Sequence, residues 1–290
     1  MGSQSAKWGY LIALSIIWGS SFILIKKALI GLTPYQMGAL RIAFTAFFLL
    51  VVGSGTLKNI KGKGWGWIAI SGFLGSFFPA FLFAFAQTEI DSAVASMLNS
   101  LTPLNTVIIG IIFFGVMITK RQMIGVFIGL LGTLMLIVKG GDFNPGQNYW
   151  YSILVIGSSV CYAFNINIIK KHLTKYSPLT IATGNLVTIV LPALVILYAT
   201  GFFSDVWKAP SMQKSLVYVA VLALFGTAMA KVVFNKLISI SSPVFAASVT
   251  YTMPLMAIFW GIWDGEILSA FQLLGGAVIL LGVYLVHRKV

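Results

Sequence analysis

Long apolar runs, with almost no charge between their ends, constrain this chain more than any other feature. A helix needs about 20 residues to cross the hydrocarbon core of a bilayer. Ten runs of about that length can be marked, at about 8–30, 34–53, 64–86, 92–115, 120–138, 150–169, 177–200, 214–238, 243–263 and 269–287. Only 9% of the residues are charged, against about 25% in a soluble domain. We therefore predict an all-α polytopic membrane protein with ten transmembrane helices.

The composition also excludes several classes of protein. Short loops leave no room for a catalytic domain outside the membrane, and the chain has neither a nucleotide-binding motif nor a His-Glu-x-x-His motif. No pair of carboxylates lies at membrane depth, so the chain lacks the general acid and general base that such hydrolysis needs. The single cysteine, Cys161, excludes an internal disulfide and a multi-cysteine metal site. We expect no enzymatic activity, no metal and no cofactor.

Charged residues are divided unequally between the two sides of the predicted membrane. The side with both termini carries twelve basic residues and no acidic ones, and the opposite side carries five basic residues and all six acids. The other two cations, Arg41 and Lys231, lie within spans. The positive-inside rule then places both termini in the cytoplasm. The net charge of +13 is explained by loops that face anionic lipid, so we expect no nucleic-acid partner.

Three segments of the first half recur in the same order in the second half. Trp18–Leu29 matches Tyr162–Leu173, 144 residues later. Gly75-Ser76 matches Gly226-Thr227, and Leu101–Leu104 matches Thr252–Leu255, both 151 residues later. Gln122–Gly132 matches Gln272–Gly282, 150 residues later. We predict two five-helix repeats, residues 1–145 and 146–290. Because five is odd, the second repeat enters the membrane inverted. Inverted repeats are typical of secondary transporters, which hold the substrate between the repeats near the midplane.

These segments resemble the drug/metabolite transporter superfamily, specifically its ten-span EamA-type members. The resemblance is carried by Trp18-Gly-Ser-Ser-Phe with Lys26 downstream, Arg41, Ala95-Ser96 before Leu101-Thr-Pro-Leu, Gln122 with Gly125 to Gly132, and the second copy of this pattern. It implies a multi-pass carrier of small metabolites in a bacterial inner membrane, often an exporter of amino acids or related compounds. It also implies that spans one, three, four, six, eight and nine line the pathway, with five and ten at the periphery. Tyr162 and Asn185 replace Trp18 and Arg41 in the second repeat, so the half-sites are not equivalent.

Polar side chains within the spans mark the candidate substrate site, because polar groups are costly in hydrocarbon. Thr227, Lys231 and Asn235 form one stripe along span eight. Lys231 either snorkels to the interface or lines the pathway, and its polar neighbours favour the pathway. Aromatic rings beside hydrogen-bonding side chains in spans one and six suit an amphipathic or aromatic solute, or ordinary helix packing. The candidate substrate-binding residues are Trp18, Ser21, Asn99, Tyr162, Asn165, Thr227, Lys231, Asn235 and Tyr251.

Two prolines and a second buried cation complete the candidate residues. Pro103 and Pro254 occupy equivalent positions in spans four and nine, and a proline removes a backbone hydrogen bond. We interpret them as paired bends or gate hinges. Arg41 lies in span two, which the family layout puts at the flank, so we assign it a structural role. Neither Arg41 nor Lys231 has an acidic residue within a span as a partner, and a buried unpaired charge is costly.

Together these patterns predict a carrier that moves a small organic solute by alternating access. Its partners are the solute and the lipid bilayer, and it acts as a monomer or a homodimer. An amino acid or a similar amphipathic metabolite is the expected cargo, with export the expected direction. A membrane channel and a lipid scramblase are the alternatives. Proton coupling lacks an intramembrane acid, since Glu89 and Asp91 lie in the loop between spans three and four.

Overall fold

The computed structural model describes residues 4–115, 120–143, 147–205 and 209–287, and no strand occurs among them. Eight stretches are long and apolar enough to cross a membrane: Ser5–Ala28, Pro34–Asn59, Gly64–Ala86, Ser92–Phe114, Tyr149–Leu173, Pro178–Ala199, Pro210–Ile240 and Pro243–Trp263. Shorter apolar helices cover Met123–Met135 and Ala270–Gly282, where spans five and ten are predicted. The prediction of an all-helical polytopic chain is confirmed, and the count of ten spans stays a prediction.

Several spans consist of more than one helical segment. The α-helices are α1 (Gln4–Ala28), α2 (Pro34–Gly53), α3 (Gly64–Gly72), α4 (Phe78–Ala86), α5 (Ser92–Asn99), α6 (Thr102–Phe114), α7 (Lys120–Phe143), α8 (Ser152–Ile168), α9 (Pro178–Ala199), α10 (Phe202–Asp205), α11 (Pro210–Val221), α12 (Ala230–Ile240), α13 (Pro243–Ala247), α14 (Met253–Trp263) and α15 (Ala270–His287). Three 3₁₀ turns are η1 (Ser54–Asn59), η3 (Tyr149–Tyr151) and η6 (Ser248–Tyr251), and three π-helical turns are η2 (Phe73–Phe77), η4 (Ile169–Leu173) and η5 (Leu222–Met229).

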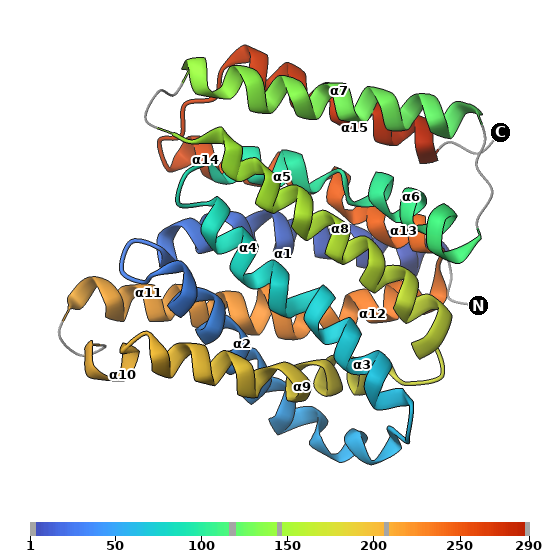
Figure 1. The fold of residues 1–290 in the computed structure, drawn as a ribbon, viewed down its shortest axis with the longest axis vertical. Helices are drawn as coiled ribbons and strands as arrows, with labels where there is room; N and C mark the ends of the chain where they lie inside the picture. Colours follow the sequence, from blue (N-terminus) through green and yellow to red (C-terminus); the bar gives the residue numbers. More distant parts are fainter. Residues whose placement is uncertain (1–3, 116–119, 144–146, 206–208, 288–290) are drawn as a thin grey trace.

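The helices α2 and α9 begin with the same local signal. The Thr33 hydroxyl accepts a hydrogen bond from the Gln36 amide at 3.3 Å, and Ser177 does the same for Thr180 at 3.1 Å. A proline follows each cap within the first helical turn, where its missing N–H costs nothing. Counterpart positions of the two halves therefore start counterpart helices, which pack against each other (Figure 1).

The helices run between two ends of the molecule that differ in charge (Figure 1). The acidic end, as we call it, holds Glu89, Asp91, Asp264 and Glu266, in the loops that follow α4 and α14. The basic end holds Lys58, Lys61, Lys63, Lys170, Lys171, Lys175 and Lys236. The first turn of α1 and the last turn of α15 both lie at the basic end. Among the charges used for the orientation, Lys208, Arg288 and Lys289 lie outside the described residues, so the cytoplasmic placement of the termini stays a prediction.

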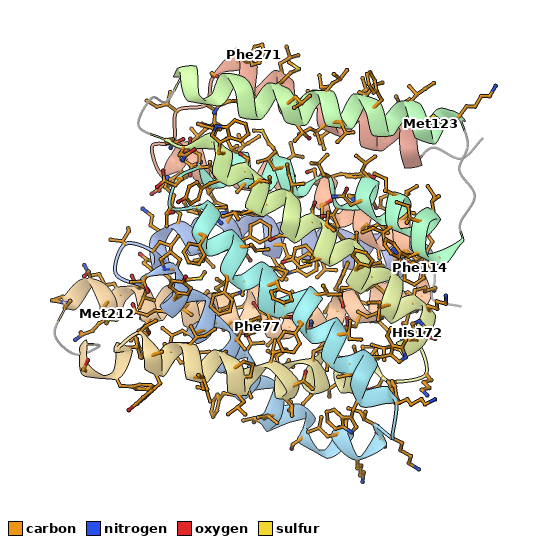
Figure 2. The ribbon with its side chains drawn as sticks, in the orientation of Figure 1. Phe77, Phe114, Met123, His172, Met212 and Phe271 are labelled. Carbon is orange, nitrogen blue, oxygen red and sulfur yellow. The ribbon has the colours of Figure 1, made fainter. Side chains whose placement is uncertain are left out.

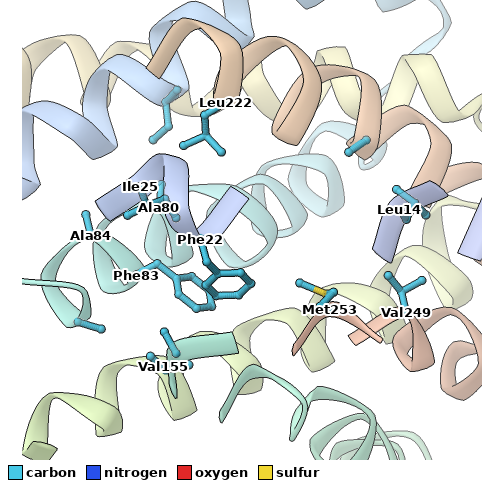
Figure 3. Packing of buried hydrophobic residues seen from close by; sticks show 14 of the residues in the cluster. Leu14, Phe22, Ile25, Ala80, Phe83, Ala84, Val155, Leu222, Val249 and Met253 are labelled. Atoms are coloured by element: carbon cyan, nitrogen blue, oxygen red, sulfur yellow. The ribbon is translucent and has the colours of Figure 1, made fainter. Parts of the chain in front are cut away.

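Apolar side chains cover the outer surface as well as the core (Figure 2). Trp263, Tyr198 and Val51 are each more than 70% exposed. A soluble protein rarely exposes large contiguous apolar patches, so this surface fits a lipid environment. Inside, the rings of Phe22 and Phe83 meet edge to face, with centroids 5.6 Å apart, between α1 and α4 (Figure 3).

Glycines bring the backbones of α7 and α15 together, and these two helices lie side by side along one face of the molecule (Figure 1). A Cβ atom on Gly282 would lie 2.7 Å from the carbonyl oxygen of Gly125 and 2.8 Å from the Cα of Gly129. A Cβ atom on Gly132 would lie 2.8 Å from the carbonyl oxygen of Gly275. Small residues of this kind are what allow close helix packing in membranes.

We expect Gly282→Ala to destabilise the protein by about 1–3 kcal/mol, because the added methyl group has no free space. Gly66→Ala is the matched control, since Gly66 lies in α3 and no atom lies within 4 Å of the place that an added methyl group would take. That substitution should leave stability unchanged or raise it slightly, because alanine favours the helix. Thermal unfolding of both variants in nanodiscs measures the difference. Equal midpoints would contradict the close approach of the two helices.

Candidate functional site

A cavity lies at the centre of the bundle, between the two halves of the chain. The cavity has a volume of about 90 Å³, whereas one buried water needs about 10–15 Å³. The cavity therefore has room for several waters or a small solute. Its lining residues are Trp18, Ser21, Phe22, Ile25, Arg41, Gly75, Ser76, Phe83, Asn99, Thr102, Tyr162, Asn165, Ile166, Gly226, Thr227, Lys231, Phe234, Asn235, Ala247, Thr250 and Met253.

The structure brings most of the candidate substrate-binding residues to this cavity. Eight of the nine line it: Trp18, Ser21, Asn99, Tyr162, Asn165, Thr227, Lys231 and Asn235. Tyr251 is not among the lining residues, although its neighbour Thr250 is. The lining comes from the six spans expected to form the pathway, with one addition from span two. That addition is Arg41, for which the sequence predicted a structural role at the flank.

Two π-helical turns contribute residues to the lining of the cavity. Gly75 and Ser76 lie in η2, within span three, and their counterparts Gly226 and Thr227 lie in η5, within span eight. A π-helical turn inserts an extra residue into the helix and is frequent at functional sites. All four residues line the cavity. The repeated Gly-Ser and Gly-Thr pairs were visible in the sequence, but nothing in them distinguished a π turn from an ordinary helix.

The two cations at the cavity are each held by a hydroxyl from the other half of the chain. Arg41 Nε donates to Thr227 Oγ1 at 2.9 Å, and Lys231 Nζ donates to Ser76 Oγ at 2.8 Å. Ser76 and Thr227 are counterparts in the two halves. Lys231 is only 7% exposed, so its ammonium group lies at the cavity rather than at a membrane interface.

The carboxylates of the described residues lie elsewhere. None of the residues that line the cavity is acidic, and the ion pairs found in the described part of the chain join Lys26 and Lys27 to Asp264 and Glu266. Arg41 and Lys231 thus have hydroxyl partners and no carboxylate partner there. A buried charge without a counterion is costly, so the cavity is a site that favours an anion.

Aromatic rings and amides supply the rest of the lining. Trp18 donates from Nε1 to the Gly226 carbonyl at 2.8 Å, and its ring meets Phe234 edge to face at 4.8 Å. The Tyr162 ring stacks on Phe83 with centroids 6.2 Å apart. Asn235 donates from Nδ2 to the Pro178 carbonyl at 3.2 Å. The lining of the cavity therefore combines aromatic rings with cations and amides.

Spans four and nine are both interrupted just before the two candidate prolines. The helix α5 ends at Asn99 and α6 begins at Thr102, with Pro103 in its first turn. In span nine the 3₁₀ turn η6 separates α13 from α14, and Pro254 lies in the first turn of α14. The two interruptions touch, because Ser100 Oγ donates to the Thr250 carbonyl at 2.8 Å. Both spans are thus interrupted beside the candidate prolines, and a role of these prolines as bends or gate hinges stays a prediction.

A buried carboxylate joins three segments at the acidic end. Glu266 accepts hydrogen bonds from Lys26 Nζ at 2.8 Å, from the Ser92 hydroxyl at 2.6 Å, and from the backbone amides of Ser92 and Ala93 at 3.0 and 3.2 Å. Its side chain is fully buried. The amides are the first of α5, so the negative charge also lies at the positive end of a helix dipole.

The neighbouring acids at this end have shifted pKa values. Burial acts to raise the pKa of Asp264, but the hydrogen bond from Lys27 and the charges of Lys26 and Lys27 outweigh it and lower the pKa below the ordinary 3.8. The ion pairs of Asp264 with Lys26 and Lys27 therefore stabilise the protein fully at a pH above 3.8, the ordinary pKa of Asp264. This stabilisation is lost as the pH falls through the lowered pKa. Burial raises the pKa of Asp91, which accepts from Gln147 Nε2 at 3.1 Å.

Comparison with known proteins agrees with this geometry. The model of the EamA-like transporter family matches the chain twice, over residues 7–138 and 149–288. The uncharacterized inner membrane transporter YedA of Escherichia coli is 27% identical over 96% of this chain and 90% of its own length. A protein of Salmonella typhimurium named "Probable amino-acid metabolite efflux pump" is 24% identical over 97% of this chain and 95% of its own length. A solved crystal structure, 16% identical, superposes with a TM-score of 0.67 over 98% of this chain and 97% of that chain, and shows the same fold.

Proposed function

Because the chain belongs to the EamA-like transporter family, we propose that it is a secondary transporter of small amphipathic carboxylates. It works by alternating access between two inverted five-helix repeats, in a bacterial inner membrane and with both termini in the cytoplasm. The observation that carries the proposal is the central cavity, which is lined from both halves and holds two cations with no carboxylate partner among the described residues.

Reciprocal contacts support the two-repeat arrangement. Arg41 in the first half bonds to Thr227 in the second, and Lys231 in the second half bonds to Ser76 in the first. The counterpart helices α2 and α9 pack together, as do α7 and α15. Contacts of this kind are expected when two similar units meet around an approximate two-fold axis. Exchanging the conformations of the two units then opens the cavity to the other side of the membrane.

The cargo follows from the chemistry of the cavity. Lys231 and Arg41 attract a carboxylate, Trp18 and Tyr162 cover an apolar or aromatic body, and the amides of Asn99 and Asn165 orient polar groups. The Salmonella typhimurium relative supports small organic cargo and the outward direction, since it is named a probable amino-acid metabolite efflux pump. We propose export on this basis.

Counterflow in proteoliposomes tests the proposal. Vesicles that contain the purified protein are preloaded with one unlabelled carboxylate from a panel of amino acids and other amphipathic acids, and the labelled form is added outside. A carrier takes up label transiently above its equilibrium level, and its initial rate saturates with concentration. We expect this behaviour for at least one member of the panel.

The alternatives predict different results in the same vesicles. A channel gives flux without transient accumulation and without saturation, and a scramblase moves a fluorescent phospholipid between leaflets. Either result without counterflow of any solute would overturn the transporter proposal. Empty vesicles, and vesicles that contain heat-denatured protein, are the controls.

A further inference from the structure

A narrow recess lies beside the main cavity. Its volume is about 20 Å³. Its lining consists of Arg41, Ile42, Gly75, Ser76, Ala80, Tyr162, Leu186 and Thr227. Five of these residues also line the main cavity, namely Arg41, Gly75, Ser76, Tyr162 and Thr227. The recess therefore adjoins the main cavity beside Arg41 and beside Ser76, the hydroxyl partner of Lys231.

Both cations are anchored on hydroxyl groups that border the recess. Arg41 Nε bonds to Thr227, and Lys231 Nζ bonds to Ser76. The structure gives Arg41 that one side-chain hydrogen bond, although a guanidinium has five N–H groups. Lys231 likewise keeps two of its three N–H groups for another acceptor. Donors are thus in surplus here, and the described residues supply no carboxylate to match them.

The amides near the cavity add to this surplus of donors. Asn165 Oδ1 accepts from the Ser71 hydroxyl at 2.6 Å, and Asn99 Oδ1 accepts from Thr102 Oγ1 at 3.3 Å. Each oxygen already has one donor, and the structure gives the two N–H groups of each amide no acceptor among the described residues. The lining therefore matches an anion well. The lining has no carboxylate that could pair with an ammonium group of a bound solute. Such an ammonium group would instead lie near Arg41 and Lys231, and like charges in close contact are strongly disfavoured.

We infer, on the basis of the proposed transport function, that the recess beside Arg41 is a carboxylate subsite and that the preferred cargo is an aromatic carboxylic acid without an α-ammonium group, rather than the corresponding amino acid. The carboxylate lies between Arg41 and Lys231, with their anchoring hydroxyls beside it. The apolar body occupies the main cavity among Trp18, Phe83 and Phe234. A bound zwitterion, which has no net charge, leaves the two positive charges of Arg41 and Lys231 uncompensated. A bound monoanion compensates one of them.

Three probes with the same phenylethyl skeleton separate the charges. They are 3-phenylpropionate with a carboxylate only, L-phenylalanine with a carboxylate and an ammonium, and 2-phenylethylamine with an ammonium only. We expect purified protein in nanodiscs to bind 3-phenylpropionate at least about tenfold more tightly than phenylalanine, because of the like-charge repulsion. We expect 2-phenylethylamine not to compete. Isothermal titration calorimetry gives the binding constants, and the proteoliposome assay gives the transport rates.

Two variants at one position link the preference to the recess. Arg41→Lys keeps the positive charge and should keep most of the preference for 3-phenylpropionate. Arg41→Gln keeps a hydrogen-bonding side chain without the charge and should reduce the preference at least several-fold. Size-exclusion profiles and thermal midpoints show whether both variants are folded, and a misfolded Gln variant is replaced by Arg41→Met.

The outcomes distinguish this inference from the proposal on which it rests. If phenylalanine binds as tightly as 3-phenylpropionate or more tightly, the inference is overturned. Counterflow of phenylalanine in that case would leave the transporter proposal intact. Failure of all three probes, with counterflow of some other solute, would also overturn the inference alone. Absence of counterflow for every solute of the wider panel would overturn both. An unchanged preference in Arg41→Gln would remove the recess from the binding site.

Discussion

Glu266→Ala should destabilise the protein by about 3–5 kcal/mol, since removal of one partner from a buried ion pair has a cost of that size. The Glu266 carboxylate is fully buried and accepts four hydrogen bonds, including one from Lys26. Without it, two amides at the start of α5 lose their acceptor, and Lys26 keeps only the more distant Asp264, at 3.4 Å. Thermal unfolding in nanodiscs, followed by tryptophan fluorescence, measures the loss.

Glu89→Ala is the matched control for this prediction, because it removes the same side chain from the same end of the molecule. Glu89 accepts one exposed hydrogen bond, from the Asn148 amide at 3.3 Å. Its replacement should change stability by less than about 0.5 kcal/mol, as is usual for surface positions. Glu266→Gln should give an intermediate loss, since the amide oxygen still accepts a hydrogen bond from Ser92 but carries no charge for Lys26. Equal midpoints for the two alanine variants would contradict the role given to Glu266.

The counterpart lysines of the two halves hold opposite ends of the molecule by different chemistry. Lys26 binds the carboxylates at the acidic end. Its counterpart Lys170 donates to the backbone carbonyls of Ile238, Ser239 and Ser241 at the basic end, at 2.7–3.4 Å. The second contact uses the unsatisfied carbonyls at the end of α12, where a positive charge also complements the helix dipole. Sequence duplication identified the pair of lysines, but their partners come from loops and caps that the duplication does not include.

The parts of the fold and site that depend on local pattern were predictable. Thr227, Lys231 and Asn235 repeat every four residues, which in an α-helix puts them on one face, and all three line the cavity although Thr227 lies in the π-helical turn η5. Eight span positions and the family followed from similar local patterns, and they agree with the structure and the comparisons.

The parts that failed depend on geometry that the sequence does not encode locally. Tyr251 is a candidate substrate-binding residue that does not line the cavity. The 3₁₀ turn η6 has three residues per turn, so Ala247 and Thr250 align on one face and Tyr251 is rotated off it. Arg41 was assigned to the flank because whole spans were assigned as lining or flanking. A long arginine side chain can reach the cavity from a helix whose other residues pack elsewhere.

Substitution of Lys231 should have the largest effect on transport. Lys231→Met removes the charge and keeps most of the side-chain volume, so the cavity loses one of its two cations and Ser76 loses its donor. A hydrogen bond to a charged group contributes about 1.5–3 kcal/mol, which corresponds to a fall of roughly 10- to 100-fold in the apparent affinity for a carboxylate. Folded yield should stay near normal, since the described residues provide no carboxylate that would be left without its partner. Initial rates in proteoliposomes, over a range of concentrations of a transported carboxylate, measure the change.

Lys236→Met provides the control on the same helix. Lys236 lies five residues further along α12 and is exposed at the basic end, so its loss should leave the transport rate within about twofold, as expected for a screened surface charge. Lys231→Arg separates charge from shape, and we expect it to retain more transport than Lys231→Met because a cation remains at the cavity. Unchanged transport in Lys231→Met would show that the cargo does not meet this ammonium group. An equal loss in Lys231→Met and Lys231→Arg, with lowered folded yield in both and normal transport in Lys236→Met, would assign Lys231 to folding and not to cargo binding.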